Sequence, residues 1–328
     1  MMNTYVAFLL GILVLLTAPY TVAAQQAGKV YRIGFLGNTP FPSHHPVWEA
    51  FTSGMRERGW IEGQNFVLEH RYSEGRNERL PALAAELVRA KVDLLVTAGT
   101  PATAAAKAAT TTLPIVFLVV GDPVASGFVT SLARPGSNIT GLGGLGPGLH
   151  AKMLELLKEA VPQASRVAMF VNSTFPLHER YRAEIEPVAR SLRITLKPFE
   201  VRTPEELVGA FATFTHDRIE ALLVLGQPLM FGLRARVAQL ALDHRTPAIA
   251  IWHEAVEAGL LMSYGDRNVD HYRRVPYYVD RILKSAKPAD VPVEQSTNFY
   301  LSIHLGTAAR LGVTIPPSLL LRAAQIVQ

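Results

Sequence analysis

The spacing of apolar residues changes repeatedly along the chain, and these changes predict alternating strands and helices. Short apolar runs rich in β-branched residues are typical of buried parallel strands, whereas apolar residues every three or four positions indicate helices that bury one face. The runs predict strands at 31–36, 93–97, 115–120, 166–171, 194–199, 221–225, 248–251 and 260–264, and alternating apolar and polar residues predict one more at 66–72. The longer period predicts helices at 47–58, 80–91, 150–160, 180–192, 234–244 and 269–283.

One further helix start is predicted from its first residues. Thr203 stands where a helix cap is expected, Pro204 follows at the first helical position, and Glu206 lies three residues after the threonine. This is the pattern of a capping box. Residues 287–292, which contain two prolines, are expected to form an extended linker.

Strands that alternate with helices predict an α/β fold with a doubly wound parallel sheet. The alternation occurs in two series, and a glycine-rich stretch at 136–148 separates them. A chain of 328 residues has room for two lobes of about 100–200 residues each. We therefore predict two doubly wound α/β lobes.

The first residues have the features of a secretory signal peptide. Residues 5–18 form an uncharged apolar run, Pro19 interrupts it, and Val22, Ala23 and Ala24 supply small residues before a cleavage site. The run is short for a membrane span. No Lys or Arg precedes it, which departs from the usual pattern, and the alternative is an uncleaved anchor helix. We predict a signal peptide at 1–24, cleavage after Ala24 and export to the periplasm.

Composition excludes several classes of function. The chain has no cysteine, which excludes disulfides, thiolate zinc sites, a thiol nucleophile and a lipid-modified cysteine, so we expect a soluble protein without a lipid anchor. Separately, we expect a monomer. The net charge is +5, but Lys and Arg alternate with Asp and Glu, as at residues 55–59. Nucleic-acid binders usually concentrate basic residues in one stripe. A nucleic-acid partner is therefore not expected.

Motifs for catalysis or cofactor binding are not convincing. Residues 141–146 match the spacing of a dinucleotide-binding loop, but that loop needs a buried strand before it and a helix that starts on its glycines. We interpret these glycines as a flexible crossing between lobes. The chain has no nucleophile elbow, phosphate loop or zinc-protease motif, and His44 and His45 are adjacent rather than spaced for one metal. We predict no enzyme, no cofactor and no metal.

Small polar residues follow the predicted strands, at the sheet edge where open α/β sheets bind ligands. These candidates are Asn38, Thr39, Ala98, Gly99, Thr100, Ala102, Gly121 and Asp122 in the first half, and Asn172, Ser173, Gln227, Tyr264 and Asp266 in the second. The alternative for any one of them is that it only caps a turn or a helix.

A small solute with a carboxylate and an amine would fit these candidates. With Thr100 as cap and Pro101 next, the amides of Ala102 and Thr103 are expected to be free for a carboxylate. Asp122 or Asp266 would pair with an ammonium group. The side chains of Asn38, Asn172 and Gln227 would complete the hydrogen bonds, with Tyr264 or Phe41 against an apolar part.

Several segments resemble a family of ABC transporter substrate-binding proteins, some of which are associated with aromatic amino acids such as tryptophan. The segment at 121–141, GDPVASGFVTSLARPGSNITG, is similar to the signature of that family. Further similar segments are at 94–100, 259–265, 278–283, 287–295 and 309–316. The chain departs from the family at His304, where asparagine is frequent, and near its end, where an acidic residue is expected after Arg322 and Ala323.

The resemblance implies a periplasmic binding protein fold of type I, in which the chain crosses between the lobes three times. The crossings are expected near Gly141, Asp266 and Thr297. Lobe 1 is then 30–140 plus 266–296, and lobe 2 is 141–265 plus 297–328. The implied function is capture of a solute, an amino acid or related carboxylate, for delivery to an ABC permease in the inner membrane. The alternative is the ligand-sensing module of an extracytoplasmic signalling system.

Overall fold

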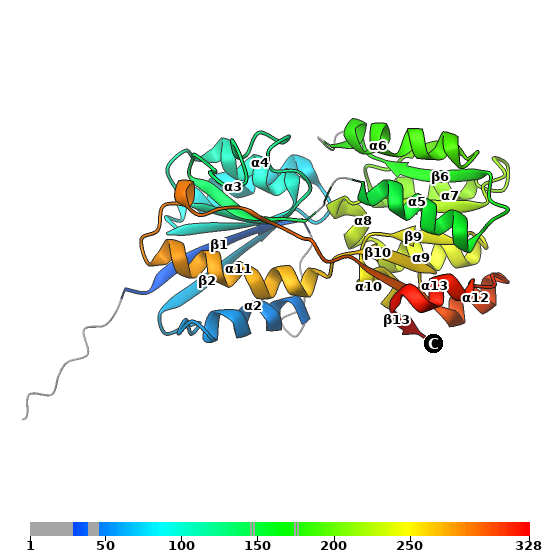
Figure 1. Ribbon diagram of the computed structural model, residues 1–328. Helices are drawn as coiled ribbons and strands as arrows, with labels where there is room; N and C mark the ends of the chain where they lie inside the picture. The colour runs from blue at the N-terminus through cyan, green and yellow to red at the C-terminus, as the bar shows by residue number, and fades with distance from the viewer. Residues whose placement is uncertain (1–28, 39–45, 145, 147, 174, 176) are drawn as a thin grey trace, which may run out of the picture. The chain divides into compact units, whose positions relative to one another are not determined.

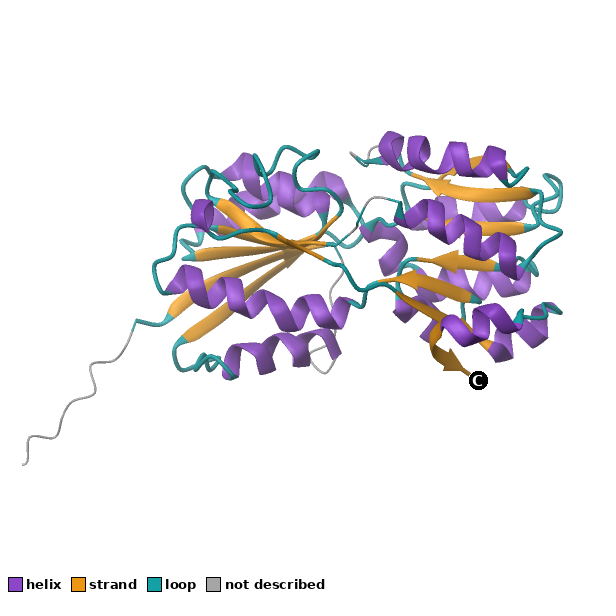
Figure 2. Cartoon of the chain, viewed as in Figure 1, coloured by secondary structure: helices purple, strands orange, loops and turns teal. Residues whose placement is uncertain are grey.

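Two mostly parallel sheets, each with helices on its faces, make up the described part of the chain (Figure 1; Figure 2). The structure is a computed structural model that describes residues 29–38, 46–144, 146, 148–173, 175 and 177–328. Residues Tyr31–Gln328 form one compact unit. The predicted signal peptide at 1–24 and the candidate Thr39 lie outside the described residues.

The first sheet has six strands, in an order that places β1 between β2 and β3. In spatial order they are β2 (Phe66–Tyr72), β1 (Tyr31–Gly37), β3 (Leu94–Ala98), β4 (Ile115–Val120), β5 (Ile139–Gly143) and β11 (Glu294–Gln295). The helices of this part are α2 (Pro46–Arg56), α3 (Leu80–Arg89), α4 (Thr100–Ala109) and α11 (Asn268–Leu283), with single 3₁₀ turns at Asn77–Arg79 and Pro288–Asp290.

Alternation along the strands divides the core of the first sheet into two layers. Leu94 and Val96 of β3 pack with α2 and α11, whereas Leu95 between them packs with α3 and α4. In Figure 1 these two helix pairs lie on opposite faces of the sheet. Because successive side chains of a strand point to opposite faces, a run of consecutive apolar residues serves both layers. This explains why the apolar runs of the sequence located the strands.

The second sheet has seven strands and repeats the order of the first. In spatial order they are β7 (Thr195–Glu200), β6 (Arg166–Val171), β8 (Ala221–Val224), β9 (Ala248–Ala250), β10 (Met262–Gly265), β12 (Tyr300–His304) and β13 (Ala323–Val327). The helices are α5 (Leu149–Ala160), α6 (His178–Ser191), α7 (Pro204–Ala212), α8 (Pro228–Gly232), α9 (Arg234–Asp243), α10 (His253–Glu257), α12 (Leu305–Leu311) and α13 (Pro317–Arg322). None of the helices in the described ranges is long and apolar enough to cross a membrane.

The predicted fold class, two doubly wound α/β lobes, is confirmed, with one difference in the second sheet. There β12 pairs antiparallel with β10, so the sheet is not purely parallel. Three connections lead from one sheet to the other: β5 to α5, β10 to α11 and β11 to β12. The exact limits of the lobes remain a prediction, although β5 continues to Gly143 and so extends beyond the expected crossing at Gly141.

The glycine-rich segment is more ordered than the sequence suggested. Residues Ile139–Gly143 form β5 beside β4, where a flexible crossing was expected. Gly141 is required there, because a Cβ atom on it would lie 2.0 Å from the Phe117 carbonyl oxygen. The next helix, α5, begins only at Leu149 and belongs to the second sheet. The motif therefore lacks the strand-to-helix turn that holds a dinucleotide.

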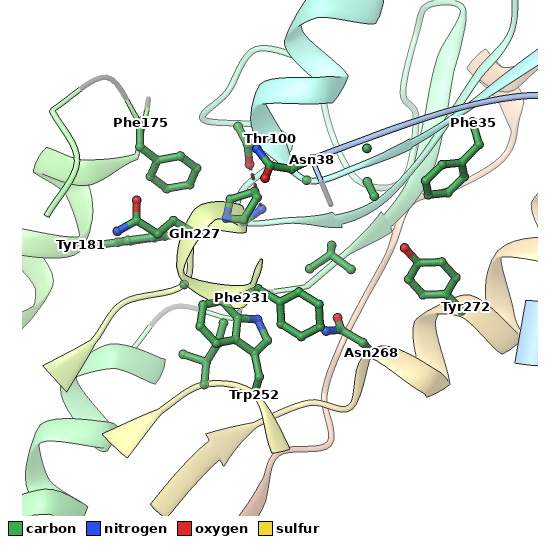
Figure 3. A pocket seen from close by; sticks show the side chains of 18 residues that line it. Phe35, Asn38, Thr100, Phe175, Tyr181, Gln227, Phe231, Trp252, Asn268 and Tyr272 are labelled. Atoms are coloured by element: carbon green, nitrogen blue, oxygen red, sulfur yellow. Dashed lines mark hydrogen bonds between the residues drawn. The ribbon is translucent and has the colours of Figure 1, made fainter. Parts of the chain in front are cut away.

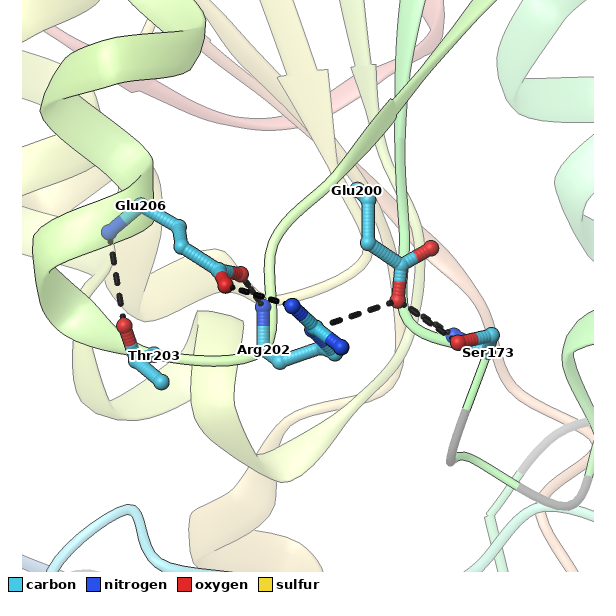
Figure 4. Close-up of polar contacts among 5 residues, drawn as sticks. All are labelled: Ser173, Glu200, Arg202, Thr203 and Glu206. Atoms are coloured by element: carbon cyan, nitrogen blue, oxygen red, sulfur yellow. Dashed lines mark hydrogen bonds and ion pairs between the residues drawn. The ribbon is translucent and has the colours of Figure 1, made fainter.

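The predicted helix cap at Thr203 is present, with a variation in its second half (Figure 4). The Thr203 hydroxyl accepts the Glu206 amide at 3.4 Å. The Glu206 carboxylate in turn accepts the Arg202 amide at 2.8 Å and pairs with the Arg202 guanidinium at 2.9 Å. The cap thus fixes the first turn of α7 as the sequence predicts.

Candidate ligand-binding pocket

A pocket lies at the carboxyl ends of strands from both sheets, with about 690 Å³ of space between its walls, part of it open to solvent (Figure 3). Ligands of open α/β sheets bind at this edge, and pockets for small molecules have volumes of this order. The wall from the first sheet and its helices consists of Phe35, Gly37, Asn38, Ala98, Gly99, Thr100, Val119, Gly121, Asn268 and Tyr272. The wall from the second consists of Phe175, Tyr181, Gly226, Gln227, Pro228, Phe231, Ile251 and Trp252.

Aromatic rings form much of this wall. Trp252 follows β9 and packs edge-to-face against Phe231 of α8, with ring centroids 5.4 Å apart. The guanidinium of Arg234 lies 4.7 Å from the Phe231 ring centroid. On the side of the first sheet, the rings of Phe35 and Tyr272 are 6.2 Å apart. Walls of this kind bury flat apolar groups well, since aromatic pairs gain from both area and ring geometry.

The start of α4 forms a polar part of the wall. Gly99 caps the helix with a φ of +87°, and a Cβ atom there would lie 2.9 Å from Cγ of Pro228. Thr100 is the first helical residue rather than the predicted cap, and its hydroxyl accepts the Gly121 amide at 3.3 Å. The amide of Thr103 donates to the Gly99 carbonyl, so it is not free as expected. The first turn of a helix still carries partial positive charge, which favours an anion.

Two buried polar atoms of the pocket wall have no hydrogen-bond partner among the described residues: the hydroxyl of Tyr181 and Oε1 of Gln227. Both side chains are only 5% exposed. Burial raises the pKa of Tyr181, which therefore stays protonated and can donate a hydrogen bond. Buried polar groups without partners cost free energy, so these two atoms are candidates for hydrogen bonds to a ligand or to ordered water.

His150 contacts Tyr181 and the residue next to Gln227. Its ring centroid lies 4.1 Å from that of Tyr181, and its Nε2 accepts the amide of Gly226, the neighbour of Gln227. Burial lowers the pKa of His150 to about 3, so the imidazole is neutral and can accept this bond. The carboxylate of Glu184 accepts the amides of His150 and Ala151 at the start of α5. A neutral, fixed imidazole thus sets the position of this wall.

The two acids predicted to bind an ammonium group do not line the pocket, and both are engaged elsewhere. Asp122 pairs with Arg180 and accepts the amides of Val124 and Ala125 at 3.0 and 2.8 Å, which is the turn-capping alternative. Asp266 is 4% exposed, and its carboxylate lies 2.6 Å from Nε2 of His271.

The other predicted residues divide into those on the wall and those away from it. The structure places Asn38, Ala98, Gly99, Thr100, Gly121 and Gln227 on the wall. Ala102, Asn172, Ser173 and Tyr264 are absent from the lining. Ser173 instead donates to Glu200 from its amide and hydroxyl, at 2.9 and 2.8 Å (Figure 4), and Tyr264 packs near the ring of Phe299. That any of the wall residues binds a ligand stays a prediction.

Sequence reasoning missed the aromatic residues of the pocket. Trp252 follows a predicted strand, so the rule that located Gln227 also applies to it. Tyr181 was predicted only as part of a helix face, and that position gives no sign of the pocket. Val119 reaches the wall through an irregularity in the pairing of β4 and β5, with a φ of +55° that is rare for a β-branched residue. Such a position cannot be deduced from a regular strand pattern.

Comparison with known proteins agrees with this architecture. A family model described as ABC transporter substrate binding protein matches residues 40–327. The Tyrosine-binding protein of Clostridioides difficile (strain R20291) is 25% identical over 270 residues, 81% of this chain and 76% of that protein. A crystal structure of the ABC domain in complex with L-Trp from Streptococcus pneumonia has a TM-score of 0.81 and 26% identity, covering 91% of this chain and all of that one. A conserved domain protein from Vibrio cholerae has a TM-score of 0.84 and 24% identity, with the same coverage.

Proposed function

The chain belongs to the family of ABC transporter substrate-binding proteins, and on that basis we propose that it captures a small aromatic carboxylate, foremost an aromatic amino acid, for import. The ligand lies in the pocket with its carboxylate at the start of α4 and its ring among Phe231, Trp252 and Tyr272. The bound form then delivers the solute to an ABC permease in the inner membrane, without converting it chemically.

The observation that carries this proposal is the composition of the pocket wall. One part combines the start of α4 with the unpartnered Tyr181 hydroxyl and Gln227 Oε1, and much of the rest is aromatic. A carboxylate and an aromatic ring on one small molecule match these two parts. L-Trp, bound in the Streptococcus pneumonia structure, and tyrosine, for which the Clostridioides difficile protein is named, each carry both of these groups.

Residues of both sheets contribute to the wall, so a ligand that touches both stabilises their joint arrangement. Domain closure around a solute is driven by contacts that exist only in the closed form. Phe231 and Trp252 belong to the second sheet, whereas Thr100 and Tyr272 belong to the part around the first. Such a liganded form is the one that we propose a permease recognises.

Isothermal titration calorimetry with L-tryptophan, L-tyrosine and L-phenylalanine tests this function, with glycine and L-glutamate as non-aromatic controls. We expect saturable one-to-one binding of at least one aromatic amino acid, no binding of the controls, and recovery of the ligand unchanged. Ligand at a hundred times its Kd should stabilise the fold by about 2.7 kcal/mol. Binding of none of the three aromatic amino acids, or their turnover, would overturn the proposal.

A further inference from the structure

No carboxylate lines the pocket to pair directly with a ligand's ammonium group. None of its lining residues is Asp or Glu, and the residues outside the described ranges contain no Asp or Glu either. Every carboxylate of the chain therefore has a described position, and none of these positions is on the pocket wall. A buried, unpaired charge is costly, so an ammonium group gains little here.

Three carboxylates near the wall along the chain are engaged elsewhere or lie outside its lining. Asp122 accepts two amides and pairs with Arg180, and Asp266 contacts His271 at 2.6 Å. Glu254 follows the wall residue Trp252 by two positions, but it is absent from the lining.

The charges and donors that do face the pocket favour an anion. The N-terminus of α4 is part of the wall, through Gly99 and Thr100. The Tyr181 hydroxyl lies close to it, because a Cβ atom on Gly121 would be 2.4 Å from that oxygen and the Gly121 amide binds the Thr100 hydroxyl. Both stabilise a carboxylate, and neither requires an amine beside it.

We propose that the site recognises the carboxylate and ring of its ligand but not the amine, and therefore also binds aryl-substituted short-chain carboxylic acids that have no amino group. This inference rests on the proposed function. It widens the substrate class from aromatic amino acids to their deaminated relatives. Gln227 provides a hydrogen bond to an amine when one is present, since its Oε1 is unpartnered and buried.

Matched ligands that each lack one group test the inference. Calorimetry should compare L-tryptophan with indole-3-propionate, which lacks the amine, and with tryptamine, which lacks the carboxylate; the corresponding sets follow for tyrosine and phenylalanine. We expect the deaminated acid to bind within about tenfold of the amino acid and the decarboxylated amine at least a hundredfold more weakly. Loss of a partner from a buried charge pair typically costs tens-fold to thousands-fold in affinity.

A deaminated acid that binds more than tenfold more weakly than its amino acid would overturn the inference while leaving the proposed function intact. Failure of the amino acids and the acids alike would overturn both. These two failures are therefore distinguishable within one series.

A substitution at Tyr181 tests whether its hydroxyl binds the carboxylate or the amine of the ligand. Tyr181→Phe removes the hydroxyl and should weaken amino acid and deaminated acid alike, by about tenfold or more, because a hydrogen bond to a charged group is lost. Tyr277→Phe, whose hydroxyl accepts from Arg281 away from the pocket, is the matched control and should bind as wild type. A Tyr181→Phe variant that weakens only the amino acid would assign the hydroxyl to the amine and contradict the inference.

Discussion

Glu254 is a carboxylic acid whose surroundings oppose its ionisation. It is 8% exposed, neither carboxylate oxygen has a hydrogen-bond partner among the described residues, and burial raises its pKa to about 7. Attraction to Arg234 offsets part of this effect, while Glu257 and Asp266 add to it. Burial also lowers the pKa of His271, but its contact with Asp266 outweighs this effect and raises the pKa above the usual value.

The Glu254 shift predicts that stability falls as pH rises from about 4.5 to about 7, and the raised pKa of His271 adds a fall that begins above pH 6.5. A raised folded-state pKa contributes stability that is present below the unfolded pKa and lost as pH passes the folded one. Glu254→Gln keeps the neutral form at every pH, so the variant should exceed wild type at pH 8 by about 3 kcal/mol, taking 1.36 kcal/mol per pKa unit. Chemical unfolding of both proteins at pH 5 and pH 8 measures this difference.

Glu257→Gln is the control for this comparison, because Glu257 lies on the same helix with its side chain 57% exposed. It should keep most of the wild-type dependence on pH, because burial, the main cause of the raised Glu254 pKa, is unchanged. Equal stability of Glu254→Gln and wild type at pH 8 would show that Glu254 is readily ionised in the fold, contrary to its burial.

At the scale of elements, substitutions in the loop after β4 test whether ligand binding at this edge of the pocket depends on packing or on charge. A Cβ atom on Gly121 would meet the Tyr181 hydroxyl at 2.4 Å and Cδ1 of Leu177 at 2.5 Å, so Gly121→Ala must displace the start of α6. We expect affinity for the aromatic ligand to fall by about tenfold or more, since small misplacements of contact groups are costly. Calorimetry measures this change.

Asp122→Asn, at the next residue of the same loop, is the control for Gly121→Ala. Asparagine retains an acceptor for the turn amides, and the exposed pair with Arg180 contributes at most about 1 kcal/mol to stability. We expect ligand affinity within threefold of wild type and a slightly lower Tm. A large loss of affinity in Asp122→Asn with little loss in Gly121→Ala would reverse these roles and restore Asp122 as a ligand residue.

The elements themselves were largely predictable where their residues lie in the sheet cores. The strands at 115–120 and 166–171 have the predicted bounds, because buried parallel strands need continuous apolar runs. The strand at 66–72, predicted from its alternating apolar and polar residues, also has the predicted bounds. The short helices α8 and α10 were missed, since five residues show no period. The strands at the end of the second sheet, β12 and β13, were not predicted at all, and the antiparallel direction of β12 depends on its connection rather than on its composition.

The site was predictable only in part, because the chain order gives a residue's place at the sheet edge but not the direction of its side chain. Residues that directly follow strands, such as Thr100 and Gln227, could be placed at the sheet edge from the chain order alone. That order does not reveal whether a side chain points into the pocket or back into its own turn, as Asp122 does. Tyr181 reaches the wall from within α6, and only the packing of that helix brings it there.

At the scale of the whole molecule, the proposed import function requires that the protein be exported from the cytoplasm. We predict that the protein recovered from the cell envelope begins at Gln25, because the apolar run at 5–18 and the small residues up to Ala24 form a cleavage signal. N-terminal sequencing of a periplasmic extract determines this. Protein found only in the cytoplasm with Met1 intact would contradict both the location and the import function.

The central claim is that the pocket between elements of the two sheets holds a small aromatic carboxylate. Mass spectrometry of the ligand that stays bound through gentle purification tests this most directly, with Gly121→Ala purified in parallel. We expect one aromatic carboxylic acid per chain, with or without an amino group, in the wild-type protein and clearly less of it in the variant. A sugar, a cation or a molecule without a carboxylate in its place, retained equally by both proteins, would contradict it.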